Sequence, residues 1–381
     1  IASGGNYNVV VGDEAGTALT TGDDNTFIGY ASGDATTTAG GNTSVGSSAF
    51  STNTTGADNV AIGEAALLRN TTASNNTAVG NNALRENTTG AENVALGAEA
   101  LDANTTGAEN VSVGYGSLSN ATTASYNTAV GKSSLGSTTT GANNTAVGKS
   151  ALAANTTGAD NTTVGSGALT ANTTGTGSVA VGKNSMNNNT TAIDNTAVGM
   201  NSLFYNTTGT ANVAFGRNAL QANTTASNNT AVGYLSLTAN TTAANNTAVG
   251  YQAASTGVTA TGITAVGYRA LYTNTGVNNA AFGGQALQNN TTGTRNNAFG
   301  GATAGGTDGA LGKNTTGSDN TAMGNQAISQ NTTGSSNVAI GSAALYANTT
   351  ASNNTALGHS ALGANTTGAN NVAIGSLTLD A

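Results

Sequence analysis

The sequence predicts an all-β fold, a parallel β-solenoid (β-roll) of about twenty-two coils of 17 residues each. A glycine recurs at every seventeenth position from Gly12 to Gly267, and the same spacing resumes from Gly324 to Gly375. The typical unit has a Thr-Thr-Gly triplet, a five-residue Asn-x-Ala-Val-Gly segment and an Ala-Leu pair. A fixed period of roughly this length is typical of a stacked repeat protein.

The unit Asn87–Ala103 shows the elements expected in each coil. Val94 and Leu96 are large and apolar, and the small Ala95 stands between them. This period of two predicts a short strand with Val94 and Leu96 facing the core and Ala95 facing outward. Leu101 adds a second apolar column to the core, and variable residues such as Glu92 are expected to face water.

The corners of the coil are predicted at the glycines. Gly90 and Gly97 flank the strand of the same unit, where a corner needs a positive φ or a close approach of two backbones. Glycine and asparagine at fixed positions would interrupt any helix. Hairpins would need turn pairs such as Asn-Gly, which never occurs, or Asp-Gly, which occurs once at Asp308-Gly309. Parallel stacking of each strand on its counterpart in the next coil is therefore expected.

The chain is predicted to be one solenoid domain spanning residues 1–381. A disordered low-complexity chain is the alternative that its composition suggests, but such a chain has no reason to keep a strict period. The repeat is irregular at 1–46, where the Asn-Thr-Thr triplet is missing, and at 251–283. Seven extra residues enter around 301–313, and they predict a loop insertion or a functional protrusion.

Composition and charge exclude several classes of function. Charged residues make up 7% of the chain and the formal net charge is −8, so binding to nucleic acid is not expected. No apolar run is long enough for a membrane helix, so no membrane insertion is expected. The chain begins at Ile1, and we expect a processed form or a fragment of a longer protein whose coils stack end to end on further coils.

Catalytic and metal-binding constellations are missing from the sequence. His359 is the only histidine, and it occupies a variable position expected to face outward. Carboxylates are scattered, no glycine pattern matches a phosphate loop, and the repeat of calcium-binding β-rolls does not occur. The chain is therefore not expected to be an enzyme, and no cofactor or metal is expected.

Asn-Thr-Thr recurs through the chain and permits two interpretations. It is formally an acceptor for N-glycosylation, and it is also suited to a corner ladder in which asparagine and threonine bond to the backbone and to each other. The candidate acceptors are Asn53, Asn70, Asn87, Asn104, Asn155, Asn172, Asn206, Asn223, Asn240, Asn331, Asn348 and Asn365. The threonine columns could also order water in the manner of an ice-binding solenoid, although only one of two adjacent threonines can face outward.

The segment Gly90–Gly97 (GAENVALG) with Ala100-Leu101 resembles the head repeat of trimeric autotransporter adhesins of the YadA type. It is similar also to the NTAVG and NTTG arrays of phage tail fibres and bacterial surface fibres, and the resemblance covers nearly the whole chain. It implies a left-handed, homotrimeric β-roll on a secreted fibre. Those head repeats are about three residues shorter, and the extra residues here lie between the leucine and the Thr-Thr-Gly corner.

A stripe of small residues typified by Ala95 is interpreted as a trimer contact, with tight packing inside a single-chain coil as the alternative. The predicted function is a structural segment of an extracellular fibre, an adhesin head or shaft or a tail-fibre-like filament at a cell surface or virion. Its expected partners are copies of itself, as a homotrimer or stacked end to end, and a host-surface or glycan receptor. The alternative is a monomeric solenoid that displays a ligand-binding surface for glycan or ice.

Overall fold

The computed structural model describes residues 5–257, 259–302 and 308–379. All regular secondary structure in these residues is β, and it consists of three-residue strands connected by turns and bends. The chain divides into two compact units, Ile1–Ala192 and Ile193–Ala381, which share the same coil architecture.

The first unit contains eleven of the strands. They are β1 (Val9–Val11), β2 (Thr26–Ile28), β3 (Thr43–Val45), β4 (Val60–Ile62), β5 (Thr77–Val79), β6 (Val94–Leu96), β7 (Val111–Val113), β8 (Thr128–Val130), β9 (Thr145–Val147), β10 (Thr162–Val164) and β11 (Val179–Val181).

The second unit contains the other eleven. They are β12 (Thr196–Val198), β13 (Val213–Phe215), β14 (Thr230–Val232), β15 (Thr247–Val249), β16 (Thr264–Val266), β17 (Ala280–Phe282), β18 (Asn297–Phe299), β19 (Thr321–Met323), β20 (Val338–Ile340), β21 (Thr355–Leu357) and β22 (Val372–Ile374).

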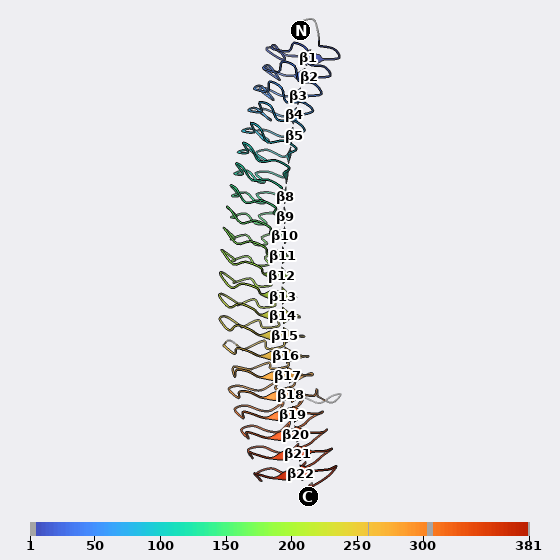
Figure 1. The fold of residues 1–381 in the computed structure, drawn as a ribbon, viewed down its shortest axis with the longest axis vertical. Coiled ribbons are helices and arrows are strands. Elements are labelled where there is room, and N and C mark those ends of the chain that lie inside the picture. The colour runs from blue at the N-terminus through green and yellow to red at the C-terminus, as the bar shows by residue number, and fades with distance from the viewer. Residues whose placement is uncertain (1–4, 258, 303–307, 380–381) are drawn as a thin grey trace. The chain divides into compact units, whose positions relative to one another are not determined.

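Within each unit every strand pairs in parallel with the strand of the next coil (Figure 1). The register places like residues side by side, so that Val60 lies beside Thr77 and Ala61 beside Ala78. The parallel β-solenoid predicted from the period is thereby confirmed. β16 and β17 also pair in register although their coil is one residue short, with Thr264 beside Ala280.

The insertion lies between β18 and β19, which pair as neighbouring coils do elsewhere, with Asn297 beside Thr321. Extra residues therefore enter without displacing the strand register. The loop predicted at 301–313 falls partly outside the described residues, which omit 303–307.

The orientation predicted for the strand side chains is wrong. Ala95, the middle residue of β6, is completely buried, whereas Leu96 is 37% exposed and Val94 is partly exposed. The same inside-out order recurs along the stack, with a buried middle residue and more exposed flanking residues in β4, β13 and β20. The period of two is correct, but its phase is reversed, and the small residue faces the core.

The reversal follows from the narrow interior of the coil. Leu101 is completely buried and fills the core from the other side, as its counterparts Leu84 and Leu118 do. Opposite this leucine column the strand presents a residue no larger than alanine in most coils, as at Ala61 and Ala95. Close packing leaves no room for a second large side chain, so the large strand residues face outward.

The predicted corner glycines are confirmed. Gly97 has a φ of 132°, and a Cβ atom built on it would lie 2.8 Å from the carbonyl carbon of Gly114 in the next coil. A Cβ atom on Gly90 would collide with the carbonyl oxygen of Gly107. Glycine is required in the column of Gly97, because its φ is positive and the next backbone lies too close for a side chain, whereas the column of Gly90 also holds alanine, as at Ala73 and Ala124.

Candidate functional surfaces

The candidate glycosylation residues form the inner ladder of the Asn-Thr-Thr corner. Asn87 Nδ2 donates to Asn70 Oδ1 at 2.9 Å and to the carbonyl oxygen of Gly90 at 2.9 Å. Asn104 Nδ2 in turn donates to Asn87 Oδ1 at 2.8 Å. Eleven of the twelve candidates are at most 1% exposed, and Asn365 is partly exposed. A glycan on any of the eleven would require the coil to open.

A second asparagine ladder, which the sequence analysis did not identify, precedes the strand. The backbone N–H of Asn93 donates to Asn76 Oδ1 at 3.0 Å, and Asn93 Nδ2 donates to the carbonyl oxygen of Gly107 at 2.9 Å. Asn110 repeats the arrangement in the following coil. The recurrence of asparagine immediately before nearly every strand was the available signal. These amides satisfy the buried corner backbone, and side-chain bonds in register run along the stack.

The two threonines of each corner have different surroundings. The hydroxyl of the first, such as Thr88, donates to the backbone carbonyl of its counterpart Thr105 at 2.9 Å. The second, such as Thr89 or Thr106, is exposed. In most coils only the second of the two adjacent threonines is exposed, as expected from the sequence, whereas both are exposed at Thr54-Thr55 and at Thr291-Thr292.

On the outer face of the strands, the residues that end each strand form an apolar column within each unit, beside a column that is threonine in more than half of the coils. The apolar column includes Ile62, Leu96 and Val164 in the first unit, which are 39%, 37% and 41% exposed. Phe215 and Met323 in the second unit are 55% and 44% exposed, and their neighbours follow at each coil. The rings of the outward residues Phe282 and Phe299 stack with their centroids 4.8 Å apart. The proposed contact stripe of small residues is thus buried, and large apolar side chains occupy the exposed face.

The variable residues beside the strand face solvent, as predicted. Glu92 is exposed, and so is His359, which lies in the column that follows the strand glycine. Tyr234 and Tyr251 in that column are 39% and 45% exposed. Among the described residues, no three His, Cys, Asp or Glu side chains gather as metal ligands.

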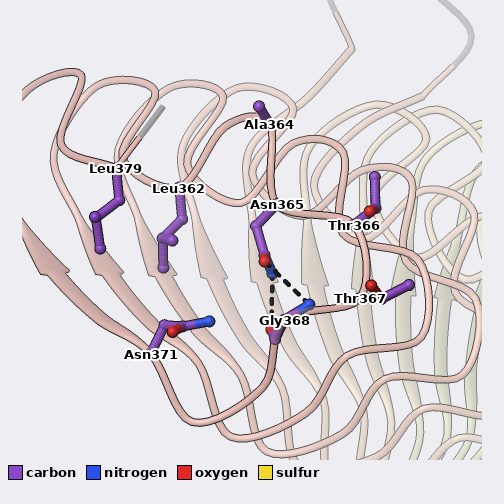
Figure 2. A pocket seen from close by; sticks show the side chains of 8 residues that line it. All are labelled: Leu362, Ala364, Asn365, Thr366, Thr367, Gly368, Asn371 and Leu379. Atoms are coloured by element: carbon purple, nitrogen blue, oxygen red, sulfur yellow. Dashed lines mark hydrogen bonds between the residues drawn. The ribbon is translucent and has the colours of Figure 1, made fainter. Parts of the chain in front are cut away.

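A hollow of about 420 Å³ lies on the last described coil, and Figure 2 shows the side chains that line it. It is lined by Leu362, Ala364, Asn365, Thr366, Thr367, Gly368, Asn371 and Leu379. Asn365 Nδ2 donates to the carbonyl oxygen of Gly368 at 2.9 Å, and Asn365 Oδ1 accepts from the Gly368 N–H at 3.1 Å. These positions correspond to the ones that each preceding coil presents to its successor.

The described part of the chain contains no helical segment with the length and hydropathy of a membrane span. No protein-family model matches the chain, and no curated protein matches it significantly.

Proposed function

We propose that the chain is a structural segment of an extracellular fibre, an adhesin head or shaft or a tail-fibre-like filament, at a cell surface or on a virion. We propose further that copies of the chain associate side by side through the outer face of the strands. The observation that carries this proposal is the row of exposed valine, isoleucine, leucine, phenylalanine and methionine side chains along that face.

The length of the apolar column supports an extended contact between proteins. Eleven coils at about 4.8 Å each give a column about 50 Å long within each unit. The neighbouring column at the start of the strands is threonine in more than half of the coils. A contact along this face would therefore combine apolar side chains with hydroxyl groups that can hydrogen-bond across it.

Copies related by rotation about an axis parallel to the stack keep corresponding coils at one level, so the apolar column of one copy can meet that of the next along its length. The resemblance to trimeric adhesin repeats implies three copies.

The test is the mass of the full chain in solution, measured by size-exclusion chromatography with light scattering. A homotrimer is expected, with three times the 36.6 kDa of the chain. The triple variant Ile62→Lys/Leu96→Lys/Val130→Lys should dissociate to monomers without loss of β-structure by circular dichroism. Burial of three unpaired charges in an apolar contact costs several kcal/mol.

The matched control places lysines on the exposed threonine column of similar coils, as Thr72→Lys/Thr89→Lys/Thr106→Lys, and should remain assembled. A monomeric parent chain at micromolar concentration would contradict the proposal. It would favour the alternative, a single solenoid that displays a surface for glycan or ice.

A further inference from the structure

Three tyrosines form a stacked ladder on the surface of the second unit. Tyr234, Tyr251 and Tyr268 each follow the glycine after β14, β15 and β16, so the coil register brings them into one column. Their ring centroids are 5.6 Å apart at both steps, and the planes differ by 23° and 12°. The three side chains are 39%, 45% and 49% exposed.

One arginine lies beside the ring at each end of this ladder. The guanidinium of Arg217 lies 6.0 Å from the centroid of the Tyr234 ring, and that of Arg269 lies 5.6 Å from the Tyr268 centroid and 4.9 Å from the Tyr272 centroid. Arg269 Nε also donates to Gln252 Oε1 at 2.8 Å. Such cation–π contacts hold the two guanidinium groups against the rings.

The charge of these two arginines is uncompensated. The other three arginines of the chain all lie in ion pairs, Arg69 and Arg85 with Glu86 and Arg295 with Asp319. Neither Arg217 nor Arg269 has a carboxylate within 4 Å among the described residues, and the sequence has no Asp or Glu from residue 195 to residue 307. A chain of net charge −8 therefore carries a local cationic patch with four tyrosines.

We propose that this Tyr–Arg patch (Arg217, Tyr234, Tyr251, Tyr268, Arg269 and Tyr272) binds a linear acidic polysaccharide. Arginine pairs with carboxylate or sulfate groups through two parallel hydrogen bonds. Arg217 follows β13 and Arg269 follows β16, so three coil rises separate them by about 15 Å. The site is an exposed column rather than a concave cavity, and an extended polymer can reach both groups where a small ligand cannot.

The ladder between the arginines fits sugar better than nucleic acid. Single-stranded nucleic acid binds through stacking of its bases on free aromatic faces. Here each ring of the ladder has a neighbouring tyrosine ring or guanidinium group beside its face, which leaves less of that face for a base. The ring edges and phenol hydroxyls are left for the ligand, and together with Gln252 they can exchange hydrogen bonds with sugar hydroxyls.

Binding to immobilised polygalacturonate and heparin tests the proposal with the full chain at two salt concentrations. We expect binding that weakens as salt rises and falls at least tenfold in Arg217→Gln/Arg269→Gln. Arg217→Lys/Arg269→Lys should bind with an intermediate affinity, since lysine keeps the charge but not the paired hydrogen bonds. The control Arg69→Gln/Arg85→Gln changes the paired arginines of the first unit and should bind as the parent does.

Neutral dextran, polyglutamate and single-stranded DNA serve as competing ligands. No binding to either acidic polysaccharide would overturn the proposal, and so would equal binding to neutral dextran, polyglutamate or DNA. An equal loss in the Arg69→Gln/Arg85→Gln control would also overturn it. Light scattering of the Arg217→Gln/Arg269→Gln variant separates this proposal from self-association. If that variant dissociates an otherwise assembled parent, the patch is a contact between copies and the polysaccharide proposal fails.

Discussion

The inward leucine of each coil has an unusual backbone conformation for its residue type. Leu101 and Leu118 have φ values of 53° and 50° and are completely buried. A left-handed conformation costs a non-glycine residue about 1 to 2 kcal/mol. Full burial of a leucine side chain contributes about 2 to 3 kcal/mol, so packing outweighs the backbone cost. Ile328 occupies the same position with a φ of 48°, where its branched Cβ makes that conformation still less favourable.

The asparagine ladder is interrupted at Ala121, and this predicts a stabilising substitution. Asn104 Oδ1 is buried and has no hydrogen-bond partner, because Ala121 stands where the next coil would supply an amide. Ala121→Asn should place a side-chain N–H donor against Asn104 Oδ1, as Asn104 Nδ2 donates to Asn87 Oδ1 one coil earlier, and raise the free energy of unfolding by about 1 kcal/mol. Urea denaturation measures the change. Ala154→Asn, at a partly exposed alanine, is the control, and an equal or lower stability of the Ala121 variant would contradict the prediction.

Asp34 predicts a dependence of stability on pH. Burial raises the pKa of its carboxyl above the usual range, and the negative charge of Glu14 raises it further, while hydrogen bonds from the backbone oppose the shift. One buried carboxylate oxygen of Asp34 has no hydrogen-bond partner. The folded chain therefore holds the proton more tightly than the unfolded chain, and the stability gained from it at low pH is lost as pH rises through the folded-state pKa.

Asp34→Asn should accordingly raise the midpoint of thermal unfolding at pH 7 and change it little at pH 3, where the native carboxyl is protonated. Differential scanning calorimetry at the two pH values measures both midpoints. Asp58→Asn, at an exposed position, is the control and should change neither. A larger gain for Asp34→Asn at pH 3 than at pH 7 would reverse the assigned sign.

At the scale of one element, the coil of β2 shows that the interior has a fixed volume. Its strand carries Phe27, completely buried, where most coils have alanine. Glycine replaces the core leucine in the same coil at Gly33 and in the preceding coil at Gly16. A Cβ atom on Gly33 would lie 2.7 Å from Phe27 Cδ1, and one on Gly16 would lie 3.1 Å from Phe27 Cδ2. The phenylalanine ring thus occupies the space that two leucines fill elsewhere.

Gly33→Leu should lower the free energy of unfolding by about 1 to 3 kcal/mol from overpacking, in addition to the cost of its left-handed backbone. Gly116→Leu isolates that backbone cost, because Gly116 has a φ of 59° against 60° for Gly33 and no atom lies within 4 Å of its Cβ position. Phe27→Ala/Gly33→Leu recreates the usual Ala-Leu pair and should recover part of the loss. Equal losses at Gly33 and Gly116 in urea denaturation would contradict the packing account.

At the scale of the whole molecule, nearly every coil of each unit satisfies its buried backbone and fills its core with the same residue types. The amide ladders satisfy the buried corner backbone in every coil, and the leucine and alanine columns fill the core. Because like residues lie side by side in the stack, any outward residue type becomes a column. The apolar strand face and the Tyr–Arg patch both arise in this way, and a single coil would display neither.

The parallel coil, its strand positions and its corners could all be predicted from the amino-acid sequence. Glycines such as Gly97 recur with one spacing, and only a stack of equal coils gives every one of them the same close approach to its successor. The Asn-Thr-Thr ladder was predicted on the same ground, since Asn70 and Asn87 occupy one phase of the repeat.

Which side of the strand faces the core depends instead on how the coil packs in three dimensions. Hydrophobicity ranks Leu96 above Ala95, but the distance between strand and leucine column admits the smaller residue, so available volume outweighs apolar character. The Tyr–Arg patch could not be predicted from the sequence either, because the contact of Arg269 with Tyr268 and Tyr272 depends on how the turn after β16 directs each side chain. Sequence spacing gives the column in which a residue lies, whereas packing decides what it touches.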